Sequence, residues 1–452
     1  MADRAFDHLI IGNSAAGVTA AEQIRALDEA ASVAIVSREP HPAYGRPLIS
    51  YLIEGKTTLD AIGLKAPGFY EEQRIDALLG PDYEVVELRP EAHEAVLADG
   101  SVLSYGSCLL ATGSIPFVPP IEGLDGKDNV YGFMTLDDAL ALWDEARAAA
   151  ERAHAEGRLA RAIVIGAGLI GLKAAEALSH QVDEVLVLEL APRILPAVLD
   201  AEGAAVLQGI LADHGILCRP GVSVERILGD GARAEGAVLT DGASVDCDLV
   251  VTAVGVRPNT GLAAAAGAAQ GRGLVCDDRL RTSLPDVYAA GDVVQVTDVL
   301  DGSERPLALW PNAMRQGRIA GRQMAGAPDA EPFEGSFAVN AVDFFDASLL
   351  TAGIINPAED SGCVVEVAAE GDRYAKFVRR DGCLVGYILL NRPANAGIYT
   401  ALIEQRVPLD TLDPAIFDGA PANLDFPADV RWERLHKCYP ADRDSRGWKE
   451  RD

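Results

Sequence analysis

Basic residues are scarce in this chain, where 39 lysines and arginines are set against 68 aspartates and glutamates, for a formal net charge of -29. Binding to nucleic acid requires a basic face that neutralises phosphates, so the charge argues against nucleic acid as a partner. Long apolar runs are also missing. The best candidates, AIVIGAGLIGL and LAAAAGAA, are short and interrupted by glycine, whereas a membrane span requires roughly 18 apolar residues. We therefore expect a soluble protein.

Closely spaced cysteines are absent as well, and there is no CxxC motif. The seven cysteines are Cys108, Cys218, Cys247, Cys276, Cys363, Cys383 and Cys438. An odd, scattered set fits reduced thiols in a cytosol better than a disulfide framework. The first residues, MADRAFDHLIIGNSAAG, reach a strand-like apolar stretch so early that they leave no room for an export signal. We expect a cytoplasmic protein without a bound metal.

Two similar segments stand out in a chain of 452 residues, which is long enough for two to three domains. In each segment an apolar strand leads into a glycine-rich turn, a helical pattern and a second strand. The first copy runs HLIIG, VTAAEQIRALDEA and SVAIVS, and the second runs AIVIG, LKAAEALSHQV and EVLVLEL. The turns contain Gly12, Ser14 and Gly17 in the first copy, and Gly166, Gly168 and Gly171 in the second. Each copy predicts a βαβ unit that binds a dinucleotide.

The residue types at this spacing have a physical reason. The first glycine allows the tight turn, the second lets the backbone approach the pyrophosphate, and the third lets the helix pack closely. The positive end of the helix then receives the phosphates. The residues that begin these helices are Ala15 and Ala16 in the first copy, and Leu169 and Ile170 in the second.

The two copies differ in ways that bear on their ligands. In the first, Ser14 replaces the second glycine, and Ser37 occupies the usual acidic position at the strand end, so Glu39 is the available carboxylate. In the second, Glu189 follows Gly171 by 18 positions (189 minus 171), well placed to accept hydrogen bonds from the adenosine ribose. A 2′-phosphate beside Glu189 would cost about 4 kcal/mol per charge pair at about 4 Å and an effective dielectric of about 20. We expect NADH to be preferred over NADPH.

Further motifs give the chain a family resemblance over most of residues 1–412. LLATGSIPFVPP contains Thr112 and Gly113, VGVRPNT contains Gly255, and SLPDVYAAGDV contains Gly291 and Asp292. Together with the two glycine turns, and in this order, they resemble the motifs of the pyridine nucleotide-disulfide oxidoreductase superfamily. The resemblance implies that Asp292 binds the ribityl chain of FAD. It further implies FAD at the first copy and NADH at the second.

The order of the motifs implies an architecture. Motifs for FAD at both ends enclose the copy for NADH, so the resemblance implies an α/β fold of two Rossmann-like domains, with the NAD domain inserted in the FAD domain. A C-terminal α+β interface domain follows, whose segments YAKFVRR and CLVGYILL alternate as antiparallel strands do. The expected boundaries are 1–115 and 250–328 for FAD, 116–249 for NAD, 329–412 for the interface domain and 413–452 for a tail. In such families the third domain often forms a homodimer.

A cysteine is missing where relatives use one beside the flavin. Disulfide reductases carry a CxxxxC pair there, and the peroxidase branch carries a single cysteine at the position that Tyr44 occupies. Without a thiolate there is no covalent relay through sulfur. The stretch EPHPAYGRPLIS, which includes Arg46 and Pro47, resembles that of rubredoxin and ferredoxin reductases. We predict that Arg46 and Pro47 contact the cofactor and that Tyr44 and Arg46 belong to the catalytic site.

Two positions, Tyr51 and Lys173, differ together from the pattern of the family that the chain resembles. Many relatives have a lysine where this chain has Tyr51, and a glutamate where it has Lys173. We hypothesise that Lys173 is catalytic and stabilises the reduced flavin, or pairs with a carboxylate such as Glu54. A solvated helix residue is the alternative. The stretch LALWPNAMRQGRIAGRQMAG predicts a further helix that begins near Pro311 and points its positive end at the flavin.

The function expected from these features is FAD-dependent transfer of electrons from NADH to a carrier protein, rubredoxin or an iron-sulfur protein. Two alternatives stay open: reduction of a small acceptor such as oxygen, a quinone, a persulfide or coenzyme A disulfide, and a redox subunit of a larger complex. Because carriers are usually acidic, a basic docking patch is expected. Its candidate residues are Lys376, Arg379, Arg380 and Arg392, together with Arg46.

Overall fold

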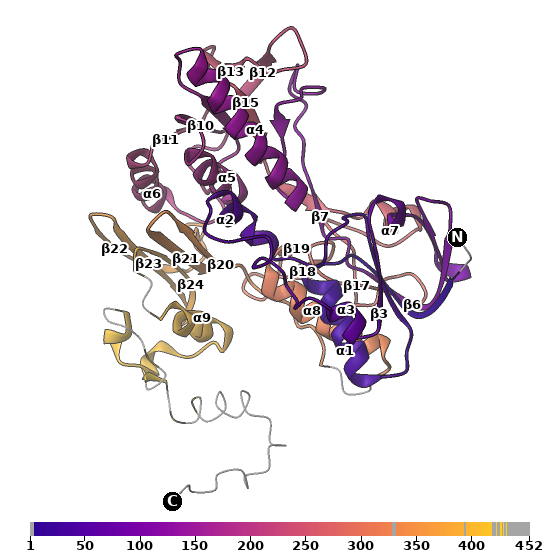
Figure 1. The fold of residues 1–452 in the computed structure, drawn as a ribbon. Coiled ribbons are helices and arrows are strands. Elements are labelled where there is room, and N and C mark those ends of the chain that lie inside the picture. The colour runs from indigo at the N-terminus through magenta and orange to yellow at the C-terminus, as the bar shows by residue number, and fades with distance from the viewer. Residues whose placement is uncertain are drawn as a thin grey trace, which may run out of the picture. The chain divides into compact units, whose positions relative to one another are not determined.

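The computed structural model describes residues 4–327, 331–392 and 395–417, together with residues 422, 425, 426, 428 and 431 (Figure 1). The chain divides into two compact units. The first comprises Met1–Ala197 and Gln208–Ala338, and the second comprises Val198–Leu207 and Val339–Asp452. Most of the expected tail, with Trp432, Cys438 and Trp448, lies outside the described residues. The short segment Val198–Leu207 joins the second unit although it comes from the middle of the chain, which the sequence did not predict.

The first unit contains a seven-stranded sheet with the order β3-β2-β1-β6-β5-β4, in which β17 also pairs with β6. Its strands are β1 (Arg4–Ile11), β2 (Val33–Ser37), β3 (Ile75–Leu79), β4 (Val85–Arg89), β5 (Glu94–Leu97), β6 (Val102–Leu110) and β17 (Val287–Ala289). Strands β3, β2, β1, β6 and β17 are parallel and largely apolar, as expected of strands buried on both faces. Strand β17 precedes Gly291 and Asp292, so the sheet brings the last motif beside the first.

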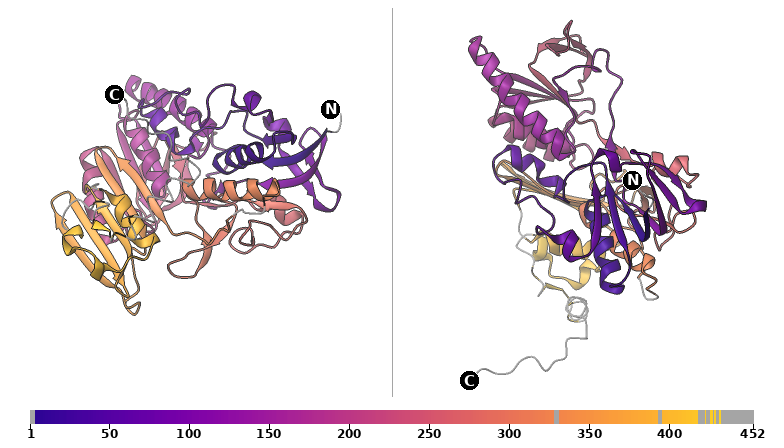
Figure 2. Two further views of the ribbon diagram at one scale, coloured as in Figure 1. Left: turned by 90° about the horizontal axis from the view of Figure 1, so that it is seen from below. Right: turned by 45° about the vertical axis from the view of Figure 1, so that its right-hand side comes forward.

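Helices α1 (Ala15–Leu27) and α8 (Trp310–Met324) lie side by side, as Figure 2 shows in indigo and orange. Two glycines of α8 make this close approach possible. A Cβ atom on Gly317 would lie 2.2 Å from the carbonyl oxygen of Ala16, and one on Gly321 would lie 2.4 Å from that of Ala20. The predicted helix with proline in its first turn is therefore present, and its glycines fix it against the helix that follows the first glycine turn.

A second parallel sheet in the first unit has the order β11-β10-β9-β15-β8. Its strands are β8 (Val130–Tyr131), β9 (Arg161–Ile165), β10 (Glu184–Glu189), β11 (Ile216–Pro220) and β15 (Leu249–Thr252). The accompanying helices are α4 (Leu136–Ala155), α5 (Leu169–Ser179) and the second half of α6 (Ala201–Asp213), whose first residues belong to the second unit. An antiparallel sheet of β12 (Val224–Leu228), β13 (Gly236–Leu239) and β14 (Ser244–Asp246) shares an apolar core with it. This is the second Rossmann-like unit that the repeat predicted.

Shorter elements complete the first unit. They are the 3-10 helices η1 (Arg46–Leu48), η2 (Pro81–Tyr83) and η3 (Pro90–Ala92), the helices α2 (Ile49–Ile53), α3 (Phe69–Glu72) and α7 (Gly261–Ala265), and the strands β7 (Ser114–Pro116), β16 (Val256–Pro258), β18 (Gln295–Thr297) and β19 (Glu304–Pro306). The strands β7 and β16 pair with each other in antiparallel register. They directly follow Gly113 and Gly255, so the motifs LLATGSIPFVPP and VGVRPNT lie together in the structure.

The second unit is built on an antiparallel sheet with the order β20-β21-β24-β23-β22. Its elements are β20 (Val339–Phe344), β21 (Ala347–Gly353), β22 (Val364–Glu370), β23 (Arg373–Arg380), β24 (Cys383–Leu390), α9 (Ala396–Glu404), η4 (Leu409–Thr411) and η5 (Pro414–Phe417). The ring of Phe377 contacts those of Tyr399 and Phe417 at centroid distances of 5.0 and 4.9 Å. The predicted fold class, two Rossmann-like units and a C-terminal α+β part, is confirmed.

Candidate active site

The first glycine turn is shaped by close backbone contacts. Gly12 has φ +126°, and a Cβ atom on it would lie 2.1 Å from the carbonyl oxygen of Ala111. A Cβ atom on Gly17 would lie 2.0 Å from the carbonyl oxygen of Gly12, so the third glycine lets α1 pack on the turn. Ser14 stands at the N-cap of α1 and makes no side-chain capping hydrogen bond to the helix. The turn therefore leaves the positive end of the helix accessible to a ligand.

The second glycine turn repeats this construction. A Cβ atom on Gly166 would lie 2.4 Å from the carbonyl oxygen of Ala253, and one on Gly171 would lie 1.9 Å from that of Gly166. A Cβ atom on Gly168 would meet nothing within 4 Å. Gly166 and Gly171 are thus required by the protein itself. Gly168 has free space in front of it, where a pyrophosphate is expected to approach the backbone ahead of Leu169 and Ile170.

Glu189 ends strand β10 beside this turn. Its Oε2 accepts a hydrogen bond from the backbone N–H of Ala167 at 2.8 Å, and its Oε1 accepts one from that of Ala191 at 2.8 Å. The carboxylate is therefore fixed at the position where an adenosine ribose is expected. Its role toward the ribose stays a prediction.

A cleft with a volume of about 770 Å³ opens at the first glycine turn. It is lined by eleven of the residues predicted to contact the FAD: Gly12, Ser14, Ala15, Ala16, Glu39, Arg46, Pro47, Thr112, Gly113, Gly291 and Asp292. They come from five separate stretches of the sequence. Gly17 does not line the cleft because it packs beneath the turn. Trp310 and Ala313, from the first turn of α8, also line it.

Arg46, Glu39 and Tyr44 form one network at this cleft. The guanidinium of Arg46 contacts Oε1 of Glu39, and the hydroxyl of Tyr44 donates to Oε2 of Glu39 at 2.6 Å. The same hydroxyl accepts a hydrogen bond from the backbone N–H of Leu136 at 2.9 Å, at the start of α4. Burial raises the pKa of Tyr44, so the hydroxyl keeps its proton. Tyr44 itself is buried and does not line the cleft.

Asp292 lies at the same cleft, where the Oγ of Ser114 donates a hydrogen bond to its Oδ2 at 3.1 Å. Burial raises the pKa of Asp292 from its ordinary value. The hydroxyl of Thr112 donates to the carbonyl oxygen of Asn259 at 2.9 Å and so joins the segment before β7 to the segment after β16. A carboxyl group in this position can bind hydroxyl groups of a ligand.

Lys173 follows the second glycine turn and belongs to a buried group of charges. Its ammonium lies 3.2 Å from Oε1 of Glu54 and also contacts Glu176. Lys56 lies 2.7 Å from Oε2 of Glu54 and 3.4 Å from Oε1 of Glu176. The side chains of Glu54 and Glu176 are 0% exposed. The pairing of Lys173 with Glu54 is therefore present, and the solvated alternative is wrong. Lys173 does not line the cleft.

Several of these residues were not predicted. Glu176 and Lys56 looked like ordinary helix and loop residues, and only their burial together reveals the charge group. Asn13 stands inside the first turn, and its Oδ1 accepts a hydrogen bond from the hydroxyl of Tyr70 at 2.8 Å. Ser114 follows Gly113 directly, so its place in the crossover motif was a usable signal.

The docking patch predicted from basic residues is wrong for Lys376, and two further members are paired with carboxylates. Lys376 is 7% exposed, and its ammonium lies 2.8 Å from Asp200. Arg46 contacts Glu39 at the cleft. Arg379 pairs with Glu366 at 2.7 Å. The side chains of Arg46 and Arg379 remain 31% and 28% exposed, so their part in docking stays a prediction.

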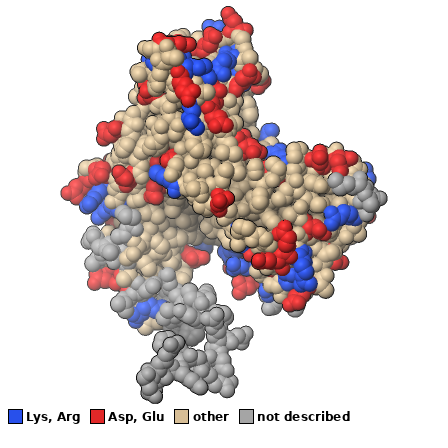
Figure 3. Space-filling model, in the orientation of Figure 1, with Lys and Arg blue, Asp and Glu red and all other residues tan. Residues whose placement is uncertain are grey.

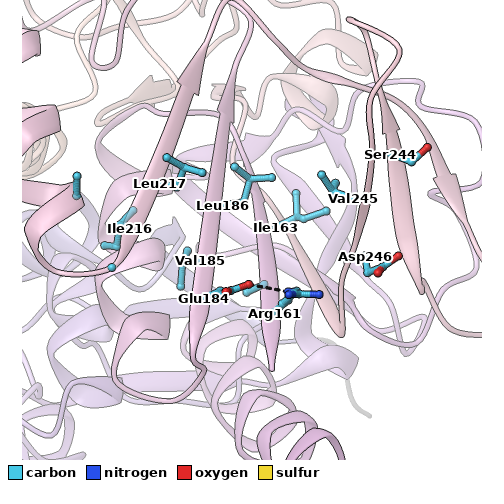
Figure 4. Close-up of a pocket in the computed structure, with 13 residues that line it drawn as sticks. Arg161, Ile163, Glu184, Val185, Leu186, Ile216, Leu217, Ser244, Val245 and Asp246 are labelled. Carbon is cyan, nitrogen blue, oxygen red and sulfur yellow. Dashed lines mark hydrogen bonds and ion pairs between the residues drawn. The ribbon is translucent and has the colours of Figure 1, made fainter. Parts of the chain in front are cut away.

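A second cleft, of about 560 Å³, lies against the other parallel sheet (Figure 4). Its floor carries the aliphatic side chains of Ile163, Leu186 and Leu217, and an ion pair between Arg161 and Glu184, 2.6 Å long, lies at one side. These residues belong to the first halves of β9, β10 and β11. The glycine turn follows the last residue of β9, so this cleft contains none of the predicted site residues.

The described cysteines are free thiols away from the first cleft. Burial raises the pKa of Cys218, Cys247 and Cys276 to about 12, which disfavours the thiolate that nucleophilic sulfur chemistry needs. Across the described part of the chain, no set of three or more histidine, cysteine or acidic side chains is placed to hold a metal ion. Within the same residues, no helix combines the length and apolar character needed to cross a membrane.

The geometry agrees with a known family. Residues 6–317 match the pyridine nucleotide-disulphide oxidoreductase family. They contain both glycine turns and the motifs around Thr112, Gly255 and Asp292. The chain belongs to this family. It is therefore an FAD-dependent oxidoreductase that uses NAD(P)H, and both glycine turns lie within the matched residues.

Individual members of the pyridine nucleotide-disulphide oxidoreductase family add detail. The chain is 31% identical to the nitrite reductase (NAD(P)H) of Bacillus subtilis, over 88% of this chain but 47% of that protein, so it spans about half of that relative. It is 31% identical to the epsilon subunit of an NADH-dependent phenylglyoxylate dehydrogenase of Aromatoleum evansii, over 91% and 95% of the two chains. The ferredoxin reductase of the CYP199A2 system of Rhodopseudomonas palustris has a similar structure, with a TM-score of 0.78, 27% identity and coverage of 90% and 96%.

Proposed function

We propose that this protein passes electrons from NADH, through its FAD, to a small electron-carrier protein such as rubredoxin or an iron-sulfur protein. The observation that carries the proposal is the absence of sulfur at the cleft. Tyr44 stands where the family resemblance places the single cysteine of the peroxidase branch, and none of the described residues that line the cleft is a cysteine. Without a thiol to relay them, electrons have to leave the flavin directly, which suits an acceptor that needs only one-electron transfer at an exposed edge.

The bound FAD supplies the electron-transfer chemistry, and the chain supplies binding and electrostatics. The backbone of the first turn, from Gly12 to Ala16, binds one pyrophosphate, and Gly166 to Gly171 bind the other. Asp292 and Glu189 accept hydrogen bonds from hydroxyl groups of the two nucleotides. Arg46, held by Glu39, places a positive charge at the cleft where negative charge would develop.

Helix α8 offers a docking surface for an acidic carrier. Pro311, Arg315, Arg318 and Arg322 follow one face of the helix, at helical spacing, and α8 contains no acidic residue. Arg315 and Arg318 are exposed, and Trp310 at the start of the helix lines the cleft. In the face seen in Figure 3, basic side chains otherwise lie scattered among acidic ones. A helix with three positive charges that starts at the flavin cleft therefore suits an acidic partner.

The test is anaerobic reduction of the FAD-loaded protein with NADH, followed by reoxidation against a panel of carrier proteins. We expect rapid reoxidation by at least one carrier and a rate that falls as salt rises, because exposed charges are screened. Arg318→Glu should lower kcat/KM for that carrier about tenfold at low salt. The exposed Arg226→Glu, with the same change of charge, is the control. Equal effects of the two variants, or no reoxidation by any carrier, would contradict the proposal.

A redox subunit of a larger complex is the second candidate. The two relatives above favour it, since one continues well beyond the region matched here and the other is named as a subunit. Turnover of the isolated chain with free carriers separates the two candidates. If NADH reduces the chain, but the chain passes electrons to an acceptor only after a co-purifying subunit is restored, the result fits a redox subunit of a larger complex. Steady-state assays with oxygen, quinones and persulfides test reduction of a small acceptor.

Two further points belong to the proposal. A cytoplasmic location is supported by the scattered free thiols, six of which are described as unpaired. A homodimer through the C-terminal part is supported by the antiparallel sheet of the second unit, one edge of which is exposed. Sedimentation analysis of the FAD-loaded protein tests the homodimer.

A further inference from the structure

Gln316 is a buried glutamine in the second turn of helix α8, where the helix passes beside strand β17 (Figure 1). The residue is 2% exposed, and its Oε1 accepts a hydrogen bond from the backbone N–H of Gly291 at 2.7 Å. Because a backbone N–H can only donate, the amide oxygen of Gln316, and not its amide nitrogen, has to face Gly291. This hydrogen bond therefore fixes both the place and the orientation of the side-chain amide.

Gly291 depends on such a hydrogen bond because its own conformation is loosely determined. Its φ is +85°, in the left-handed region that glycine adopts without strain. Its carbonyl oxygen accepts a hydrogen bond from the N–H of Val294 at 3.1 Å. With Gln316 on its N–H, both polar groups of the glycine are held, so the direction in which the main chain continues into Asp292 is set.

Asp292 is held at its carboxylate as well, where the Oγ of Ser114 donates a hydrogen bond at 3.1 Å. Asp292 and Ser114 line the cleft, whereas Gln316 does not. Gln316 can therefore affect a ligand in the cleft only through the main chain that it holds. A binding group has to be held within about 0.5 Å of its productive position, so the residue behind it contributes to binding without touching the ligand.

The position of Gln316 is itself set by the packing of α8 on α1. A Cβ atom on the next residue, Gly317, would lie 2.2 Å from the carbonyl oxygen of Ala16, so the two helices are in contact at this point. A Cβ atom on Gly291 would lie 3.3 Å from the Cβ of Ala16 and 3.7 Å from that of Ala313. The start of α1, the start of α8 and the segment after β17 thus meet at one place. Gln316 supplies a hydrogen bond between the last two.

We propose that Gln316 is a positioning residue for FAD, which acts through the main chain of Gly291 to orient the carboxylate of Asp292 toward the ribityl hydroxyl groups. The proposal rests on the expected role of Asp292 and is independent of the acceptor that the flavin reduces. It differs from a role in core packing, because packing depends on the volume of the side chain and not on its oxygen.

Release of FAD from the loaded protein, followed by the rise in flavin fluorescence after dilution, tests the proposal. Gln316→Met nearly keeps the length of the side chain but removes the acceptor, so we expect FAD release to be about tenfold faster. Gln323→Met is the matched control. Gln323 is a buried glutamine of the same helix, 8% exposed, whose Oε1 accepts from Arg281 at 3.5 Å. Its variant should change FAD release by less than about twofold.

A double-mutant cycle with Asp292→Ala separates positioning from packing. If Gln316 acts through Asp292, Gln316→Met should accelerate FAD release by less than about twofold once the carboxylate is gone. Multiplication of the two single effects would overturn the proposal, because Gln316 would then act independently of Asp292. Unchanged FAD release in Asp292→Ala would also overturn it, because the residue through which Gln316 acts would not bind FAD.

The folding of each variant is checked by far-UV circular dichroism. Gln316→Leu also removes the acceptor and favours a helix, so it takes the place of Gln316→Met if the methionine variant does not fold. Equal acceleration by the variants at Gln316 and Gln323 would overturn the proposal. Reduction of the flavin by NADH and its reoxidation by carriers are measured separately on the loaded protein, so a failure of the proposed electron transfer leaves the result on FAD release unaffected.

Discussion

The ammonium nitrogen of Lys173 lies 3.2 Å from Oε1 of Glu54, a carboxylate whose side chain is 0% exposed. Lys173 follows the last glycine of the second turn by two positions, and Glu54 caps α2, which begins just after Arg46 and Pro47. One ion pair therefore connects the segment that borders the FAD cleft to the helix that is expected to receive NADH. Glu176 and Lys56 complete the group, so two buried negative charges are balanced by two positive ones.

Replacement of Lys173 by methionine should destabilise the protein. The variant leaves Glu54 and Glu176 buried with only Lys56, and an uncompensated buried charge costs about 3 to 5 kcal/mol. The double variant Lys173→Met with Glu176→Met removes one charge of each sign and should recover more than half of the loss. Urea unfolding of the three proteins measures this. A single variant as stable as the wild type would show that the group contributes little.

The same variant tests a role in catalysis. We expect Lys173→Met to slow reduction of the bound FAD by NADH, because it removes a positive charge from the helix that is expected to receive NADH. Stopped-flow measurement about 10 °C below the variant's midpoint of thermal unfolding keeps the variant folded. In a small domain, 1 kcal/mol of destabilisation lowers that midpoint by roughly 4 to 8 °C. An unchanged rate would leave Lys173 with a structural role alone.

Tyr44 is the next candidate for substitution. Tyr44→Phe removes the hydroxyl that joins Glu39 to the N–H of Leu136, and both partners remain. We expect a loss of about 1 to 3 kcal/mol in stability, because two polar groups lose a partner. Since Tyr44 does not line the cleft, flavin reduction by NADH should change less than about twofold, well under the tenfold that 1.4 kcal/mol represents. A large loss of rate with full flavin content would instead support the predicted catalytic role.

Two glycines of the second turn should respond differently to alanine. Gly171→Ala places a Cβ atom 1.9 Å from the carbonyl oxygen of Gly166, so the backbone must move and stability should fall by about 1 to 3 kcal/mol. Gly168→Ala meets nothing within 4 Å, so the protein without nucleotide should keep its stability. Its Kd for NADH should rise about tenfold, because the new methyl group occupies the approach of the pyrophosphate. Thermal unfolding and NADH titration of both variants distinguish the two effects.

Glu189 should determine the preference for NADH. Glu189→Gln keeps an oxygen that can accept from Ala167 but removes the charge that repels a 2′-phosphate. We expect the ratio of kcat/KM for NADH to that for NADPH to fall about tenfold or more. An unchanged ratio would show that a residue other than Glu189 discriminates between NADH and NADPH at the adenosine ribose.

Asp292 gives a prediction about pH. Burial raises its pKa above 3.8, so the folded protein without FAD binds this proton to a higher pH than the unfolded chain does. The free energy of unfolding contributed by this group is therefore largest below pH 3.8 and is lost as the pH rises through the folded pKa. Asp292→Asn removes that loss, so its apoprotein should be more stable than the wild type at neutral pH. The exposed Asp125→Asn, measured by the same urea unfolding series, should show no such difference.

Much of the site could be predicted because its rules are local. A strand, glycines at fixed spacing and a helix have to be neighbours in the sequence to form a turn that binds a pyrophosphate, so Gly12 and Gly166 were identifiable at once. The crossover residues Thr112 and Gly255 could be assigned by resemblance. By contrast, the docking patch was wrong at Lys376 because a basic residue in a strand looks the same whether it faces water, as expected, or an aspartate such as Asp200.

By itself, the sequence determined the two nucleotide-binding turns, the order of the motifs and the lack of a cysteine at position 44, because each depends only on residue type and spacing along the chain. Only the tertiary structure decided that Tyr44 is buried against Glu39, that Glu54 and Glu176 share two lysines, and that the valines of β22 remain exposed. These features depend on which distant segments come into contact. A single stretch of sequence does not determine which of its residues are buried or which of its charges are paired.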